Sequence, residues 1–174
     1  FSRELYIEAE DFLPAPVPKY KRLYPDGPEC RLKGAYVIKC TGYETDAAGN
    51  VTAILAEYDP DSRGGDPADG RKVKGATIHW VDAATALDAE VRLYDNLFSD
   101  ADPDGGDKNF LDCLNPGSLE VLSGAKVEAG LKDVAAPASF QFLRQGYFCV
   151  DNKDSRPGHL VFNRSVSLKD SFKF

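Results

Sequence analysis

Short runs in which apolar residues alternate with polar ones constrain the fold of this chain more than any other feature. β-Branched and aromatic side chains are frequent in these runs, and Gly, Pro, Asn and Asp separate one run from the next. The pattern is typical of strands in antiparallel barrels or sandwiches. The expected strands are residues 4–8, 31–41, 51–58, 72–81, 90–94, 118–122, 126–128, 140–143, 146–151 and 160–168. Helical periodicity is scarce, and only residues 83–89 and 107–114 are expected to form short helices.

Turn residues indicate how these strands are connected. Residues 46–50 (DAAGN) predict a hairpin turn, because Gly and Asn accept positive φ angles. Pro14, Pro16 and Pro18 exclude a helix and a central strand, so we expect an extended tether that leads from one folded unit to the other. Residues 59–70 are expected to be a solvated connection.

The formal net charge of this 174-residue chain is −7 at pH 7, which weighs against a nucleic-acid binder, since such domains are usually basic. Net charge is an average over the whole surface, however, and RNA meets one face only. Part of the acidic surplus lies in residues 99–108, a stretch rich in Gly and Asp that is expected to be a loop between the two halves of the chain.

The cysteines Cys30, Cys40, Cys113 and Cys149 form no C-x-x-C pair, so no zinc site is predicted. Their wide spacing and apolar neighbours favour buried free thiols in a reducing, cytoplasmic compartment over disulfides. No apolar run approaches the roughly 20 residues that cross a bilayer. The first residues do not resemble a signal peptide, and the chain is expected to begin inside a longer protein.

No residues for catalysis or metal binding are predicted. His79 lies between Ile78 and Trp80 in an apolar run, where a structural histidine is expected more often than a catalytic base. Neither His79 nor His159 is part of a nucleophile motif. Gly64 and the glycine after it lack the frame of a phosphate-binding loop.

The informative segment is residues 19–39, where basic residues outnumber acidic ones in an otherwise acidic chain. Its basic residues are Lys19, Lys21, Arg22, Arg31, Lys33 and Lys39. Tyr20 and Tyr24 are interleaved with them, and Arg and Tyr can both stack on unpaired bases. Alternation along one predicted strand places Arg31 and Lys33 on the same side. The segment indicates either an RNA-binding surface or a solvated basic strand.

A second patch, residues 140–148, has Phe140 and Phe142 on either side of Gln141. One face of this strand can be core while the other presents an amide, whose donor and acceptor suit the edge of a base. An ordinary half-buried strand explains the pattern equally well.

A series of motifs along nearly the whole chain resembles the C-terminal anticodon-binding domain of glutaminyl-tRNA synthetases, a class I family. The motifs are ELYIE at 4–8, YKRL at 20–23, RLKGAYVIK at 31–39, DPADGRKVKG at 66–75, IHWV at 78–81, VRLYD at 91–95, FQF at 140–142, GYFC at 146–149 and VFNR at 161–164. Eukaryotic and archaeal glutamyl enzymes share the domain type, but IHWV and GYFC resemble the glutaminyl branch more.

This resemblance implies an all-β fold of two closed antiparallel β-barrels of the ribosomal-protein-L25 type. The first barrel with its entry segment is expected in residues 1–100, and the second in residues 101–174. The N-terminal strand of such a protein can pair with the second barrel.

The resemblance also implies roles for particular residues, because the family holds its unstacked anticodon bases in separate pockets. Arg22 matches the arginine for the third base, a guanine, which an arginine can contact through O6 and N7 together. Arg31 and Lys33 match the pair near the first base, and Gln141 matches a residue of the pocket for the middle uracil. The expected RNA-binding residues are Lys19, Lys21, Arg22, Arg31, Lys33, Gln141 and Arg144.

Three positions depart from the family's pattern. Leu143 stands where an acidic pocket residue is expected, and Lys19 stands where a glutamine is expected. Lys33 replaces an arginine, and a lysine cannot make the forked contact of a guanidinium.

The function that the resemblance implies is anticodon recognition of glutamine tRNA, as the non-catalytic part of an ATP-dependent glutamine–tRNA ligase in protein biosynthesis. The implied partners are the anticodon loop and the N-terminal catalytic domain of the same enzyme, with no membrane or DNA partner. ATP with Mg²⁺ is expected in the parent enzyme, and no cofactor is expected in this segment. The alternatives are a stand-alone L25-like RNA-binding module, the anticodon domain of a glutamyl-tRNA synthetase, and a structural protein–protein interaction domain.

Overall fold

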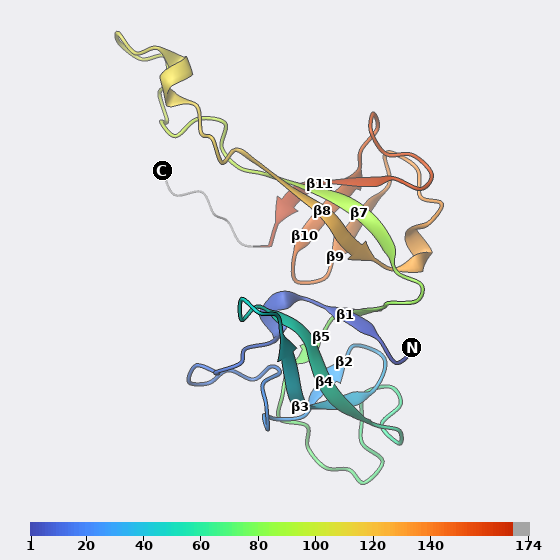
Figure 1. The fold of residues 1–174 in the computed structure, drawn as a ribbon. Coiled ribbons are helices and arrows are strands. Elements are labelled where there is room, and N and C mark those ends of the chain that lie inside the picture. The colour runs from blue at the N-terminus through green and yellow to red at the C-terminus, as the bar shows by residue number, and fades with distance from the viewer. Residues whose placement is uncertain (169–174) are drawn as a thin grey trace. The chain divides into compact units, whose positions relative to one another are not determined.

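The computed structural model describes residues 1–168, and strands dominate its regular structure (Figure 1). The chain divides into two compact units, Phe1–Ala84 and a second unit that begins at Thr85. The described helices are three 3₁₀ turns of three or four residues each. The prediction of an all-β protein is therefore confirmed.

The first unit contains a four-stranded sheet and a separate two-stranded ribbon. Its elements are β1 (Leu5–Ile7), η1 (Ala9–Asp11), β2 (Cys30–Leu32), β3 (Val37–Thr45), β4 (Val51–Asp59), β5 (Thr77–Ile78) and β6 (Trp80–Asp82). The sheet has the order β4-β3-β2-β5, and β1 pairs antiparallel with β6. Leu23, Leu32 and Ile78 are almost completely buried at the centre of the core.

The predicted hairpin turn at residues 46–50 is confirmed between β3 and β4. One carboxylate oxygen of Asp46 accepts hydrogen bonds from the backbone N–H groups of Ala48 and Asn50, both at 2.9 Å. The side chain of Asn50 donates to the other oxygen, and these bonds lower the pKa of Asp46. Gly49 takes the positive φ of 86° that the turn requires.

The prediction of a single strand over residues 31–41 is wrong, because the chain reverses between β2 and β3. Gly34 adopts a φ of 68°, and the backbone N–H of Ala35 donates to the carbonyl of Leu32 at 3.0 Å. Cys30 consequently lies opposite Ile38 in an antiparallel pair. The predicted strand 72–81 is also shorter than expected, since pairing begins only at Thr77.

Most of residues 59–70 are exposed, as expected for a solvated connection, but the segment is also anchored to the fold. Ser62 is fully buried, and its hydroxyl accepts from the backbone N–H of Val37 at 2.8 Å. The N–H of Gly64 donates to the carbonyl of Ala35 at 2.6 Å. These bonds tie the connection to the turn between β2 and β3.

The three prolines do not form a tether between units, because they lie in a loop of the first unit. This segment, residues 13–22, is called the proline loop below. Its two ends are fastened together: the N–H of Leu13 donates to the carbonyl of Leu23 at 3.1 Å, and the N–H of Leu23 donates to the carbonyl of Asp11 at 3.0 Å. The loop therefore leaves and re-enters the fold at one place.

The described part of the second unit, residues 85–168, forms a single five-stranded sheet. Its elements are β7 (Leu87–Tyr94), η2 (Phe110–Cys113), β8 (Leu119–Val127), η3 (Ala129–Leu131), β9 (Ser139–Phe142), β10 (Gly146–Val150) and β11 (Leu160–Ser167). The order is β8-β7-β11-β10-β9, in which β7 and β11 run parallel and the other pairs are antiparallel. Phe148 and Phe162 are buried in its core.

Three expectations for the second unit need correction. The helix predicted at 83–89 is absent, because Leu87 pairs with Val127 and begins β7. The strands predicted at 118–122 and 126–128 are one continuous strand, β8. Only η2 forms within the predicted helix 107–114, and Figure 1 shows it in the long connection that extends from β7 and β8.

The sheets are open among residues 1–168, so the prediction of two closed barrels is not confirmed. The edge strands are β4 and β5 in the first sheet and β8 and β9 in the second. In the first unit β5 and β6 have only two and three residues and are separated by His79, and β5 pairs with β2 whereas β6 pairs with β1. The predicted barrel boundary at residue 100 stays a prediction, and residues 169–174 of the predicted second barrel lie outside the described part.

The four cysteines are free, as predicted. Cys30 and Cys40 are buried, whereas Cys113 and Cys149 are half-buried. Burial raises the pKa of Cys30 to about 11, so this thiol is neutral at physiological pH and packs as a small apolar side chain.

Candidate nucleic-acid interface

The proline loop carries three of the predicted RNA-binding residues. Lys19 and Lys21 are exposed on it. Lys19 adopts a positive φ of 68° in a turn that the N–H of Tyr20 closes by donating to the carbonyl of Val17 at 3.1 Å. The turn and the fastened ends hold these cations on a short, closed piece of backbone.

Arg22, the third of these residues, is held by two acidic neighbours at the end of the loop. Its Nε lies 3.2 Å from a carboxylate oxygen of Asp11, which is completely buried. Its Nη1 donates to the backbone carbonyl of Glu10 at 3.2 Å and lies 3.6 Å from the Glu10 carboxylate. About a third of the Arg22 side chain, 32%, is still exposed to solvent.

Tyr20 supports the same arrangement. Its hydroxyl donates to the carbonyl of Glu10 at 2.9 Å, and burial raises its pKa. The carbonyl of Glu10 therefore accepts from both Tyr20 and Arg22. This fixes the orientation of the guanidinium before any ligand arrives, which reduces the entropy lost on binding.

Arg31 and Lys33 do not lie side by side on one strand, which corrects that expectation. Arg31 is in β2, where its Nε donates to the carbonyl of Gly65 at 2.6 Å and its Nη2 lies 3.4 Å from Asp66. Lys33 is in the turn after β2, where its carbonyl accepts from the indole N–H of Trp80 at 3.0 Å. Residues 59–70 thus position Arg31, and β6 positions Lys33.

Gln141 and Arg144 belong to the second unit. Gln141 is exposed on β9, while Phe140 and Phe142 on either side of it pack on the core, so the predicted division into a core face and an amide face is confirmed. Arg144 follows in the turn between β9 and β10 with a φ of 67°. The structure therefore brings Lys19, Lys21 and Arg22 together on one loop and places the other residues on separate elements.

Part of the acidic surface is engaged in clusters of ion pairs that do not involve the cations of the proline loop. Arg71 contacts Glu29, Asp59 and Asp69 at 2.9, 2.7 and 3.0 Å, and its pKa is raised above the usual range by these carboxylates. Arg92 lies 2.7 Å from both Glu90 and Asp154 in the second unit. Part of the negative charge is thereby neutralised locally.

Two residues of the site are missed by sequence reasoning. Asp11 and Glu10 precede the proline loop and look like ordinary surface acids. Their contacts with Arg22 depend on closure of the loop, which the sequence does not reveal. The one available signal is that Asp11 directly precedes the apolar pair Phe12 and Leu13, which would be expected to face the core.

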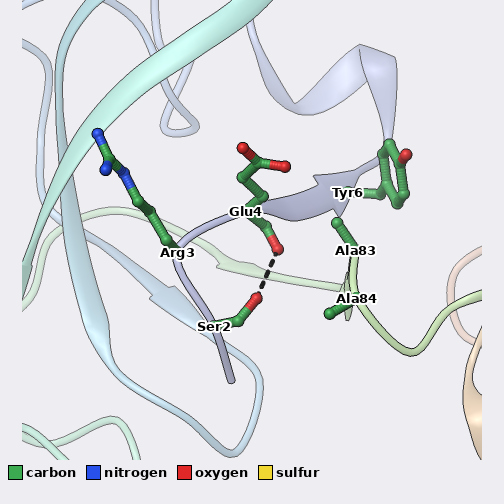
Figure 2. Close-up of a pocket in the computed structure, with 6 residues that line it drawn as sticks. All are labelled: Ser2, Arg3, Glu4, Tyr6, Ala83 and Ala84. Carbon is green, nitrogen blue, oxygen red and sulfur yellow. Dashed lines mark hydrogen bonds between the residues drawn. The ribbon is translucent and has the colours of Figure 1, made fainter.

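A hollow in the first unit contains none of the predicted site residues. Figure 2 shows its lining by Ser2, Arg3, Glu4, Tyr6, Ala83 and Ala84. The hydroxyl of Ser2 donates to the carbonyl of Glu4 at 3.2 Å inside it.

Within residues 1–168, no group of three or more His, Cys, Asp or Glu side chains could hold a metal ion. None of the helices in that range is long and apolar enough to cross a membrane.

Comparison with known families identifies both units. Residues 1–59 and residues 77–151 each match a family model described as tRNA synthetases class I (E and Q), anti-codon binding domain.

The chain is also similar to glutamine–tRNA ligases along its whole length. It is 56% identical to the ligase of Cupriavidus taiwanensis over 98% of this chain, and 52% identical to that of Polynucleobacter necessarius over 99%. The ligase of Pseudomonas syringae pv. tomato is 49% identical over 99% of the chain. The chain spans only 29–30% of the length of these relatives. It belongs to the anticodon-binding domain family of the class I tRNA synthetases (E and Q).

Proposed function

We propose that this protein reads the anticodon of glutamine tRNA as the non-catalytic part of an ATP-dependent glutamine–tRNA ligase. The observation that carries the proposal is identity of about half or more, over 98–99% of the chain, to proteins named glutamine–tRNA ligase. The same observation favours glutamine over glutamate as the amino acid of the parent enzyme.

The proposed parent enzyme supplies the chemistry. ATP with Mg²⁺ and an N-terminal catalytic domain belong to the part of the enzyme outside this chain, and no cofactor is assigned to the residues described above. A cytoplasmic location is part of the proposal, and the four free cysteines are consistent with it because thiols stay reduced in the cytoplasm. The finer architecture, two L25-type barrels divided near residue 100, is part of this proposal.

At the level of single bases, Arg22 is proposed to read the guanine at the third anticodon position. Its guanidinium is fixed by Asp11 and Glu10 while a third of the side chain faces solvent. A positioned arginine discriminates guanine through O6 and N7, whereas adenine presents a donor in place of O6. Lys19 and Lys21 on the same loop supply charge for the phosphates, which gives affinity without base preference.

The remaining predicted residues are proposed to serve the other two bases. Arg31 and Lys33 serve the first base, with Arg31 oriented by the carbonyl of Gly65 and Lys33 held through its backbone by Trp80. Gln141 and Arg144, on and beside β9, serve the middle uracil.

The test is a binding titration of the protein with tRNA that has guanine or adenine at the third anticodon position. One bidentate contact is worth about 1–3 kcal/mol, so Arg22→Ala is expected to lower the guanine preference by about 5- to 150-fold. Arg22→Lys keeps the charge and should lose most of the preference as well. The control is Lys132→Ala, which removes an exposed cation from the second unit. If Arg22→Ala is folded under the assay conditions and weakens both RNAs equally, Arg22 contacts the backbone and does not read a base.

A further inference from the structure

An aromatic side chain lies beside the predicted base-reading amide of the second unit. Tyr147 of β10 is directly opposite Gln141 of β9 in their antiparallel pair. Directly opposite residues have Cβ atoms about 4.5–5.5 Å apart and share one face of the sheet. Both side chains are exposed, Tyr147 by 47%.

The opposite face of these strands is a tightly packed set of rings. Phe142 stacks on Phe148 with ring centroids 4.4 Å apart, and it meets Phe162 at 5.2 Å with the rings at 65° to each other. Phe148 and Phe162 are 2% and 0% exposed. These contacts join β9, β10 and β11 through the core. The outward row of side chains, Gln141, Tyr147 and Val166, therefore lies on a sheet whose other face is firmly packed.

Among residues 1–168, no hydrogen bond or ring contact engages the Tyr147 side chain. Tyr94 of β7 is equally exposed, at 47%, but its hydroxyl donates to Asn163 at 2.8 Å. Val166 lies opposite Tyr147 on β11 and is 57% exposed, so the outward row is apolar on one side of the ring and polar on the side of Gln141.

We propose that Tyr147 is the stacking platform for the base whose edge Gln141 contacts. The inference rests on the proposed function, because it requires a single-stranded anticodon base at this face. A base that lies on the phenol ring can turn its Watson–Crick edge to the amide, which offers both a donor and an acceptor. The ring then supplies affinity for any base, since every base has a π face, and the amide supplies the preference.

The test compares binding of an RNA anticodon stem-loop that has uracil or cytosine at its middle position. Tyr147→Leu is expected to weaken both RNAs by about 5- to 150-fold and to leave their ratio unchanged, which is the effect of losing one base–aromatic stack. Tyr147→Phe should stay within about twofold of the wild type, because the ring is retained. Gln141→Ala should change the ratio, and the control Tyr94→Leu should leave both affinities unchanged.

A cross-linking measurement tests the contact directly. An RNA with 5-iodouracil at the middle anticodon position is irradiated with the protein, and the linked residue is found by mass spectrometry. A link to Tyr147 is expected, and a link to a different residue would overturn the proposal. If Tyr147→Leu binds like the wild type while Gln141→Ala loses its preference, the platform is wrong and the proposed function stands. If the wild-type protein binds neither RNA, the proposed function fails, and this inference fails with it.

Discussion

Replacing Asp11 by asparagine removes the negative charge of the buried side chain but keeps its size and shape, so it tests what the charge contributes to stability. The amide of the new side chain would keep an oxygen near Nε of Arg22, which lies 3.2 Å from the carboxylate, but the contact would no longer be an ion pair. An exposed ion pair contributes about 0.2–1 kcal/mol, whereas breaking a buried one costs about 3–5 kcal/mol. The Arg22 side chain is partly exposed and Asp11 keeps its place, so we expect Asp11→Asn to lower the free energy of unfolding by about 1–2 kcal/mol.

Arg22→Ala should cost more, because it removes the guanidinium that lies 3.2 Å from the completely buried carboxylate of Asp11. Breaking a fully buried pair costs about 3–5 kcal/mol. The Arg22 side chain is 32% exposed, and water screens this pair in part. We therefore expect about 2–4 kcal/mol. The double variant Asp11→Asn with Arg22→Ala contains no buried charge at this place and should be more stable than Arg22→Ala alone.

Urea unfolding followed by tryptophan fluorescence measures these differences. Trp80 is the single tryptophan of the chain and lies on β6, so the signal reports on the first unit. In tRNA binding, Asp11→Asn should also reduce the third-base guanine preference while Lys19 and Lys21 still contact phosphate. If the double variant is less stable than Arg22→Ala, the two substitutions act independently and Asp11 does not fix the guanidinium.

Two further predictions concern charge. Hydrogen bonds from Asn163 and from backbone N–H groups, with Arg92 nearby, lower the pKa of Asp151 to about 2, so this carboxylate stabilises the second unit above about pH 4 and the stabilisation is lost as the pH falls towards 2. Asp151→Asn should therefore lose less stability than the wild type between about pH 5 and pH 2.5 in urea unfolding followed by circular dichroism, and equal losses would contradict this assignment. If the proline loop and its basic neighbours contact about three to five phosphates, the logarithm of the tRNA affinity should fall against the logarithm of the salt concentration with a slope of about −2 to −4. An affinity that does not change with salt would show that these cations are only solvated.

The sequence predicts those parts of the fold that depend on neighbouring residues. Residues 46–50 contain every group of their turn, since Asp46 accepts from residues two and four positions later. Gly34 gives no turn signal of this kind, because its neighbours are typical strand residues and contain no Pro, Asn or Asp. The helix predicted at 83–89 does not form, because residues 87–89 pair with β8, which is distant in sequence.

The candidate site shows the same limit. The basic segment is visible in the sequence, and the outward position of Gln141 follows from the alternation in β9. The contacts that orient the cations come from elsewhere: Asp11 reaches Arg22 across the proline loop, and Gly65 reaches Arg31 from 34 residues away. A single sequence contains no local pattern for such pairings, because loop closure and burial decide them.

Because the two ends of the proline loop are hydrogen-bonded to each other, the sequence of the loop can be replaced without disturbing the rest of the first unit. Leu13 and Leu23 are joined through backbone groups, so the junction does not depend on which side chains the loop carries between them. Related proteins can therefore diversify the loop without repacking the interior. Arg22 is the exception, because it forms an ion pair with the buried Asp11 while part of its side chain is exposed to solvent. Changes that retune recognition at this position must also satisfy the buried carboxylate, so here evolution of specificity is constrained by folding.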